Sequence, residues 1–320
     1  MIKAIINDIS SISVVLNVYN ETENIEECLS RIRKQNYPQD KIEIVIVDDN
    51  STDNTIELAQ KFSVKVVKSG FRNRERAKSI GINFAKGELI LFMDADVFLI
   101  SDQWLSKAAS YLQKYPSASA VQNIRWGYKK KDYIANRYCN LFGINDPLVF
   151  FLGKRGALMA TENEWPYKDT VIKRGSDYYL AQFNTDTLPT LGAQGYLARR
   201  ERILKTSWKP YFFHLDTAYE LVEKGYREFV MAELEIEHRY VKSILQFYRK
   251  LARNLRLFLE LREYRKYTYK VENLRFIFAI ILMLSIIYPL AQSIKGYIKK
   301  PDIAWVLHPL FCLTVPLLYG

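Results

Sequence analysis

Cysteine and histidine are scarce in this chain: each accounts for only three of its 320 residues. The cysteines Cys28, Cys139 and Cys312 lie far apart without a Cys-x-x-Cys pair, which argues against a disulfide framework and a cysteine-based zinc site. Glycine (13) and proline (10) are too few for a collagen-like or low-complexity protein. The length and the 49% of hydrophobic residues instead predict one large or two smaller domains with a sizeable core.

Several nucleotide-binding signatures are also absent. The chain has no Walker A motif and no Gly-x-Gly-x-x-Gly, which argues against a P-loop NTPase and a Rossmann dehydrogenase. The net charge of +11 favours a polyanionic partner. Because no nucleic-acid-binding module is recognisable, we expect phosphorylated small molecules or an anionic membrane surface rather than nucleic acid. The sequence leaves the oligomeric state open.

The N-terminal segment does not have the pattern of a signal peptide. Its apolar stretches are short and are broken by Asn7, Asp8 and a serine cluster, and no small-residue cleavage site follows. We therefore expect the catalytic part to stay in the cytoplasm.

Long apolar runs occur only near the C-terminus. Residues 276–294 carry no charge, and such a run of about 19 residues can cross a bilayer of ~30 Å at ~1.5 Å per residue. The second run, 303–318, is shorter and contains two prolines. We expect one or two transmembrane helices here. A buried helical hairpin is the alternative, and the second run could also be re-entrant or interfacial.

Basic residues gather just before the first apolar run. Residues 242–275 contain ten Lys/Arg against three Glu. Leu251, Leu255 and Phe258 follow spacings of three to four, which predicts an amphipathic helix. Such a helix beside a membrane span is typical of an anionic cytoplasmic leaflet, and a solvated surface helix is the alternative.

Strand and helix patterns alternate through the first 93 residues. Apolar runs predict strands at 13–18, 42–47, 64–67 and 88–93. Helical spacings predict helices at 23–35, 55–62 and 76–85. The alternation predicts an α/β fold with a mostly parallel central sheet, in which ligands bind outside the carboxyl ends of the strands.

Polar residues follow three of these predicted strands, at 19–21, 48–49 and 94–96. In the third segment, Asp94-Ala95-Asp96, alternate residues of an extended chain point the same way, so a short turn can bring both carboxylates to one cation. Carboxylates suit Mg²⁺ or Mn²⁺, which are usually shared with substrate phosphates. A turn with solvated or helix-capping carboxylates is the alternative.

Three segments taken together, VYNE (18–21), VDDNSTDNT (47–55) and GINFAKGELILFMDAD (81–96), resemble the family 2 glycosyltransferases. The resemblance covers roughly residues 11–250. It implies the GT-A nucleotide-sugar-binding fold and transfer of a sugar from a nucleotide-sugar with inversion. The commonest donor in this family is a UDP-sugar, and a GDP-sugar is possible.

The resemblance also implies a donor site. Tyr19 and Glu21 would line the base and ribose pocket, and Asp48 and Asp49 would contact the base and ribose. Asp94 and Asp96 would bind the divalent ion, Mg²⁺ or Mn²⁺, that holds the diphosphate. Where the family has Ala-Arg-Asn-x-Gly, this chain has Lys78 and Ser79 in place of Arg and Asn, so Arg74, Arg76 or Lys78 would contact the donor.

For the acceptor side the resemblance implies Gly195 beside the transferred sugar and Asp216 as the catalytic base, with Leu215 where relatives often carry an acid. The alternative for Asp216 is an N-cap of a helix at 217–224. If the acceptor is a phosphate, it is already ionised, and Asp216 would chiefly orient it or a neighbouring cation. His238 would lie at the metal and donor phosphates, although a lone histidine is more often structural.

Residues 246–250 resemble the Gln-x-x-Arg-Trp motif of processive synthases, with Lys250 in place of Trp. This departure and the few apolar runs favour a non-processive enzyme that adds one sugar. Arg249 and Lys250 are expected to face lipid headgroups or phosphates.

These features predict a GT-A catalytic domain at 1–225, a basic amphipathic juxtamembrane segment at 226–272 and a membrane anchor at 273–320. The predicted function is transfer of one sugar to a lipid-linked acceptor, a polyprenyl phosphate or lipid-linked saccharide, at the cytoplasmic face of the cell membrane. One alternative is a glycosyltransferase with a non-lipid acceptor. Another is a nucleotidyltransferase, whose glycine-rich, lysine-bearing loop is replaced here by acidic residues near position 20. A non-catalytic binding subunit is disfavoured by the intact carboxylates.

Overall fold

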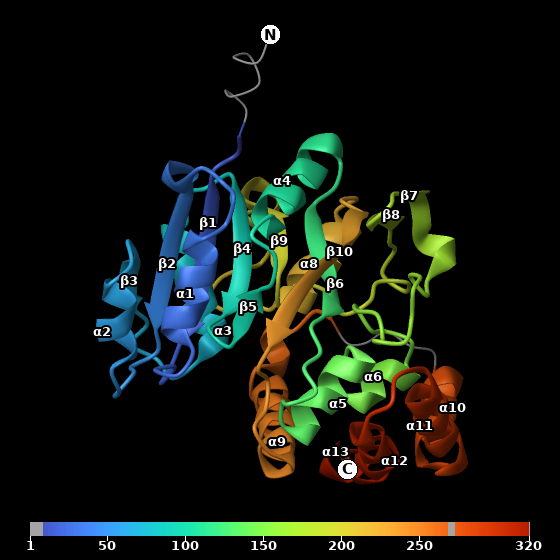
Figure 1. Ribbon diagram of the computed structural model, residues 1–320. Helices are drawn as coiled ribbons and strands as arrows, with labels where there is room; N and C mark the ends of the chain where they lie inside the picture. The colour runs from blue at the N-terminus through green and yellow to red at the C-terminus, as the bar shows by residue number, and fades with distance from the viewer. Residues whose placement is uncertain (1–8, 268–272, 320) are drawn as a thin grey trace.

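A computed structural model describes residues 9–267 and 273–319 of the chain (Figure 1). Residues 268–272, which belong to the expected basic segment, lie outside the described residues, as do 1–8 and 320. One ten-stranded sheet runs through the molecule in the order β3-β2-β1-β4-β9-β6-β10-β8-β7, with β5 paired to β10.

The first part of the sheet is parallel, as predicted. Its strands are β1 (Ile12–Val18), β2 (Ile42–Asp48), β3 (Lys65–Lys68) and β4 (Leu89–Asp94). The helices between them are α1 (Ile25–Arg33), α2 (Thr55–Gln60) and α3 (Arg74–Phe84). The residues of β1 and β4 are buried almost throughout, because helices cover both faces of this part of the sheet.

The rest of the sheet is mixed. Its strands are β5 (Val97–Leu99), β6 (Ala120–Trp126), β7 (Val171–Arg174), β8 (Tyr178–Gln182), β9 (Tyr196–Arg199) and β10 (Glu228–His238). Strand β9 runs antiparallel to both β4 and β6, and β10 is parallel to β6 but antiparallel to β8 and β5. The prediction of a mostly parallel sheet is therefore wrong: β9 is inserted against the strand direction, and antiparallel neighbours follow it.

Strand β10 is the last strand of the sheet in chain order. It lies beyond residue 225, the expected end of the catalytic domain, and pairs with three other strands. The sheet therefore continues to His238, and the segment after it begins the helical part of the molecule.

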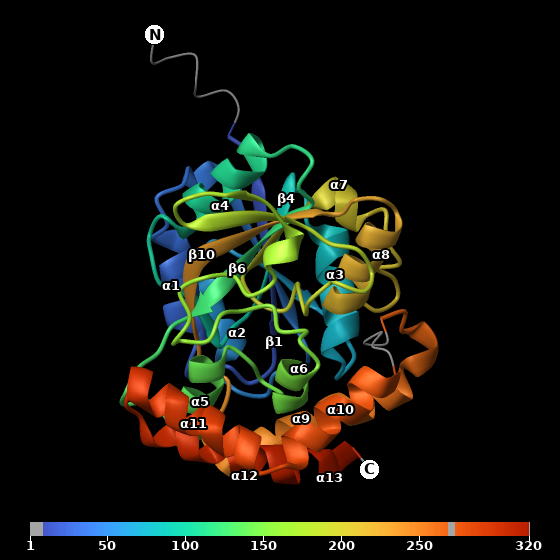
Figure 2. The ribbon, with the colours of Figure 1, turned by 90° about the vertical axis from the view of Figure 1, so that its right-hand side faces the viewer.

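A layer of helices lies against one end of the sheet (Figures 1 and 2). It contains α5 (Ile134–Phe142), α6 (Pro147–Phe151), α9 (Ile244–Glu260), α10 (Asn273–Leu284), α11 (Ile287–Lys299), α12 (Leu307–Thr314) and α13 (Pro316–Tyr319). Buried aromatic side chains, including Tyr138, Phe247 and Phe311, belong to one hydrophobic cluster to which all of these helices except α11 contribute. The remaining helices, α4 (Trp104–Lys114), α7 (Arg200–Ile203) and α8 (His214–Glu223), pack beside the sheet.

The first apolar run does not form one helix. It is divided between α10 and α11, which meet at a bend of 68°. Pro289 explains the break, because it has no N–H to donate to the carbonyl of Ser285 and its ring would clash there. Ile286, at the bend, has a φ of 60°, which is strained for a β-branched residue.

Among the described residues, therefore, no helix is by itself long and apolar enough to cross a bilayer. The α10–α11 pair would meet the requirement only as a bent unit, by its length and composition.

Candidate active site

The carboxyl ends of β1, β2 and β4 meet at one edge of the sheet. In the strand register Val18 lies opposite Asp48, and Asn17 lies opposite Asp94. The three polar segments at 19–21, 48–49 and 94–96 are therefore neighbours, as the sequence predicted.

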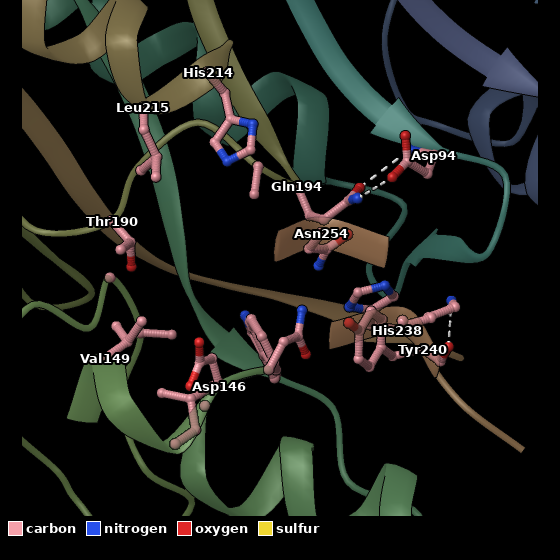
Figure 3. Close-up of a pocket in the computed structure, with 18 of the residues that line it drawn as sticks. Asp94, Asp146, Val149, Thr190, Gln194, His214, Leu215, His238, Tyr240 and Asn254 are labelled. Carbon is pink, nitrogen blue, oxygen red and sulfur yellow. Dashed lines mark hydrogen bonds between the residues drawn. The ribbon is translucent and has the colours of Figure 1, made fainter. Parts of the chain in front are cut away.

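A cavity of about 280 Å³ lies beside this edge. Asp94 and Asp96 line it from the end of β4, and Arg74 and Lys78 line it from α3. Its other side is formed by the loop before β9, the start of α8, the end of β10 and α9. Figure 3 shows Gln194, His214, His238, Tyr240 and Asn254 from these elements around the hollow, with Asp94 on its rim.

Asp94 is held in its ionised form. Its carboxylate accepts a hydrogen bond of 2.5 Å from Gln194 Nε2 and lies 3.3 Å from Lys78 Nζ (Figure 3). Burial would raise the pKa of this carboxyl, but the positive charges of Lys78 and Arg74 hold it well below its usual range. Asp94 is therefore an anion at every physiological pH.

Asp96 has two basic neighbours. Its Oδ1 lies 3.6 Å from His238 Nε2, and its Oδ2 lies 3.6 Å from Lys250 Nζ. Burial lowers the pKa of His238, although the charge of Asp96 opposes the shift. The His238 ring is therefore neutral near pH 7 and able to accept a proton or bind a metal ion. Lys250 lines the cavity, and the expectation that it faces phosphates or lipid headgroups stays a prediction.

The donor atoms at this edge fit a divalent cation that is shared with a ligand. Asp94 Oδ1 and Asp96 Oδ1 are buried and accept no hydrogen bond within the described part of the chain, although Lys78 Nζ lies 3.3 Å from the first and His238 Nε2 lies 3.6 Å from the second. No group of three or more His, Cys, Asp or Glu in that part is arranged as a complete metal site. Oxygen ligands of this kind suit Mg²⁺ or Mn²⁺, which commonly complete their coordination with substrate phosphate and water.

Glu21 lies close enough to these carboxylates to be affected by them. Burial and the charge of Asp96 raise the pKa of Glu21 to about 7. Its carboxylate accepts a hydrogen bond of 2.9 Å from Asn24. The pKa of Glu21 therefore depends first on burial and second on the charge of Asp96.

The predicted nucleotide residues occupy the open end of the same edge. Asp48 and Asp49 are buried, and they accept hydrogen bonds from the Ser51 backbone N–H and the Ser69 hydroxyl. Tyr19 is 40% exposed, which leaves one ring face accessible to a planar ligand. None of the three lines the cavity beside Asp94, so their contacts with base and ribose stay a prediction.

The structure separates the three basic candidates on α3. Arg74 and Lys78 line the cavity, whereas the Arg76 guanidinium lies 3.3 Å from the centre of the Phe71 ring.

Gly195, which was predicted to lie beside the transferred sugar, does not line the cavity. Its φ of +58° and the closeness of Asn123 Oδ1, 2.6 Å from where a Cβ would stand, allow the loop that carries Gln194 to pass close to β6.

Asp216 lies at the start of α8 but does not line the cavity. Its carboxylate accepts hydrogen bonds from Arg265 Nε at 2.8 Å, from Tyr267 N at 3.0 Å and from Lys266 N. It makes no N-cap, because α8 begins at His214. In this arrangement Asp216 orients a cation, Arg265, and its role as a base stays a prediction.

Sequence reasoning missed many of the lining residues, among them Gln194, His214, Tyr240 and Asn254. Gln194 precedes the glycine that was singled out, and His214 lies two residues before the predicted base. Gln194 and His214 therefore lie close in sequence to residues that were predicted. Only the fold shows which side chains reach the cavity.

Comparison with known proteins identifies the family. Residues 13–186 match the model of Glycosyl transferase family 2. The chain belongs to this family. Its fold is the α/β GT-A type with a mixed sheet.

Two relatives and one solved structure illustrate the similarity. "Glycosyltransferase AglE" of Haloferax volcanii is 31% identical over 133 residues, 40% of this chain and 43% of the relative. A "Dolichol-phosphate mannosyltransferase" of Pyrococcus furiosus is 41% identical over 98 residues, 27% of this chain and 26% of the relative. The chain thus spans less than half the length of these curated relatives.

The mannosyltransferase PcManGT from Pyrobaculum calidifontis, solved in complex with GDP-Man and Mn²⁺, shares the fold. The TM-score is 0.56 at 16% identity, covering 97% of this chain and 87% of that one.

Proposed function

We propose that this glycosyltransferase moves one sugar, with inversion, from a nucleotide-sugar to a lipid-linked acceptor at the cytoplasmic face of the cell membrane. The observation that carries the proposal is the position of the cavity. It lies between the carboxylates at the ends of the parallel strands and the helical layer, in which α10, α11 and α13 expose apolar side chains.

The donor side follows from the charges around Asp94 and Asp96. These two carboxylates, with His238 beside them, would hold Mg²⁺ or Mn²⁺, which neutralises phosphate charge and stabilises the departing nucleotide. Lys78 and Arg74 lie on the same wall and supply positive charge for the diphosphate. A UDP-sugar is our first choice of donor and a GDP-sugar our second. GDP-Man and Mn²⁺ in the structurally similar mannosyltransferase agree with this chemistry.

The transfer is a single displacement. An acceptor oxygen forms a bond to the anomeric carbon while the bond from that carbon to the diphosphate oxygen breaks, and the electron pair leaves with the nucleotide. A phosphate acceptor arrives ionised, so no proton has to be removed. Asp216 then acts by holding Arg265 near the acceptor, whereas a hydroxyl acceptor would need Asp216 as the base.

The membrane location rests on the surface of the C-terminal helices. Several of their apolar side chains are highly exposed: Leu274 81%, Ile287 79%, Ile298 74% and Leu317 78%. Figure 2 shows α10, α11 and α12 side by side along one edge of the molecule. An exposed apolar surface of this extent favours contact with a membrane. The basic residues of α9 would face anionic headgroups on the cytoplasmic side.

A donor screen tests the proposal. Detergent-solubilised protein is incubated with radiolabelled UDP- and GDP-sugars, Mn²⁺ or Mg²⁺ and a polyprenyl phosphate, and organic-extractable label is counted. We expect label from one donor, and we expect it to disappear with EDTA and in Asp96→Ala. Metal-dependent hydrolysis of a donor without lipid label would contradict the lipid acceptor but keep the donor site.

A further inference from the structure

A second cavity, of about 570 Å³, adjoins the first and is large enough for a small-molecule ligand. We call it the tail cavity. The side chains that line it and do not line the first cavity are mostly apolar, and they come from α6, the residue before α8, α9 and α10. They include Leu148, Leu152, Phe213, Leu255, Phe258 and Phe276.

The polar lining of the tail cavity lies mainly where the two cavities meet. Arg74, Asp146, His214 and Asn254 line both cavities. The tail cavity is therefore not a separate hollow. It continues the first cavity in the direction of α10, and its own lining is mostly apolar, with Glu75, Arg265 and Asn273 as the polar residues that line the tail cavity alone.

His214 marks the junction between the two cavities. Its Nδ1 is buried and has no hydrogen-bond partner among the described residues. Burial lowers the pKa of His214 to about 3, so the ring is neutral. A neutral imidazole with an unused nitrogen can bond an acceptor head group without adding charge.

Two arginines lie at the inner end, and each is paired with one carboxylate. Arg74 Nε lies 3.1 Å from Glu75, which also lines the tail cavity, and Arg265 lies 2.8 Å from Asp216. Each guanidinium has further N–H groups beyond those in its ion pair. A guanidinium binds phosphate with two parallel hydrogen bonds, so the inner end suits the phosphate of an amphiphile.

The outer end lies against the apolar helix surface. Phe276 lines the tail cavity and is 43% exposed, and Leu274 and Ile277 on the same helix are 81% and 53% exposed. Phe276 therefore connects the lining of the tail cavity to the exposed apolar surface of α10.

From these observations we infer that the tail cavity binds the hydrocarbon chain of a prenyl-phosphate-type acceptor, with the phosphate directed towards Arg74 and His214. The inference rests on the proposed function, because it names the part of the protein that selects the lipid acceptor. It adds that selection takes place inside the enzyme and depends on chain length.

Photo-crosslinking tests whether a prenyl chain binds in the tail cavity, and it does not require sugar transfer. The full chain in detergent is irradiated with a farnesyl phosphate that carries a diazirine at the end of its chain, and labelled peptides are identified by mass spectrometry. We expect label in 148–152 and 255–258, removed by excess geranylgeranyl phosphate. Label confined to α11 and α12 would overturn the inference.

Steady-state kinetics test whether the tail cavity selects the acceptor by its chain length. Leu255→Trp narrows the tail cavity, whereas Leu259→Trp, on the same helix but outside the cavity and 55% exposed, is the matched control. We expect Leu255→Trp to raise the KM for geranylgeranyl phosphate at least tenfold while the KM for isopentenyl phosphate and donor hydrolysis stay unchanged. Leu148→Trp repeats the test from the α6 wall if the first variant folds poorly.

The two proposals fail in different ways. Equal KM values for Leu255→Trp, Leu148→Trp and the control would overturn the tail cavity while wild-type transfer still supports the proposed function. A wild type that transfers sugar only to a water-soluble acceptor would contradict the proposed function. Label in the two wall peptides would in that case still show that the cavity binds a prenyl chain.

Discussion

The sheet edge and the helical layer meet at the same cavities with opposite chemistry. At the ends of β1, β2 and β4 the chain gathers carboxylates, with lysine and arginine from α3 beside them. From the other side, α6, α9 and α10 contribute mainly leucine and phenylalanine. The sheet edge is suited to phosphates and a divalent ion, and the helical layer to hydrocarbon. Substitutions in the two regions should therefore impair different steps.

The largest effect is expected at the sheet edge. Asp96→Asn should lower metal-dependent transfer by on the order of 10³, because a lost charge at the ion costs several kcal/mol. Donor hydrolysis should fall with it, while lipid binding should not change. Asp169→Asn, which changes an exposed carboxylate on the short helix at Lys168–Thr170, is the control. Full activity in Asp96→Asn would place the ion elsewhere.

The second-largest effect is expected at the ion pair between Asp216 and Arg265. Asp216→Asn and Arg265→Ala should lower transfer to a phosphate acceptor by similar factors, roughly 10–100-fold, because hydrogen bonds between charged groups are worth ~1.5–3 kcal/mol. Steady-state kinetics on both variants checks this. If only the Asp216 variant lost activity, Asp216 would be the base and not a partner of Arg265.

The sequence predicted the sheet edge more accurately than the helical layer. The strands β1, β2 and β4 were predicted to within one residue, because apolar runs bounded by polar ends identify buried parallel strands. The motif residues at their ends were predicted for the same reason. The antiparallel insertion of β9 could not be predicted, since strand direction depends on distant pairing and β9 has only four residues.

The acceptor side was predicted less well. The apolar run at 276–294 had the composition of a span, but Pro289 divides it and α10 packs against α6 instead. The lining residues Gln194 and His214 come from loops or helix starts, whose side-chain directions are fixed by tertiary contacts. No periodic pattern in the sequence encodes such positions.

A smaller effect should be confined to the helical layer. The double variant Ile287→Asp, Ile298→Asp changes side chains that are 79% and 74% exposed, so the fold should persist. Partition into anionic vesicles should fall at least tenfold, because burying each side chain in lipid is worth ~1.5–3 kcal/mol. Cosedimentation measures it, with Ile172→Asp, 52% exposed on β7, as control. Unchanged partition would contradict the membrane surface.

The smallest effect is a pH dependence at the sheet edge. The folded state keeps the proton of Glu21 up to about pH 7, whereas an unfolded glutamate loses it near 4.5. Wild-type stability should therefore fall as the pH rises from about 4.5 to 7. Glu21→Gln should raise the Tm at pH 8 by about 2–4 °C for each kcal/mol of relieved repulsion.

Thermal melts in EDTA, with the exposed Glu57→Gln as control, test this dependence. The gain in Tm should be smaller at pH 5, where Glu21 is protonated in the folded wild type. An equal gain at both pH values would contradict the raised pKa.

The central claim is that Asp94 and Asp96 hold the donor diphosphate through a shared divalent ion. Calorimetric titration of UDP and GDP into the wild-type protein, with Mn²⁺ and with EDTA, tests it most directly. The described residues contain no complete metal site, so Mn²⁺ alone should bind weakly, and nucleotide affinity should rise at least tenfold with Mn²⁺. Equal nucleotide affinity with Mn²⁺ and with EDTA would contradict the account.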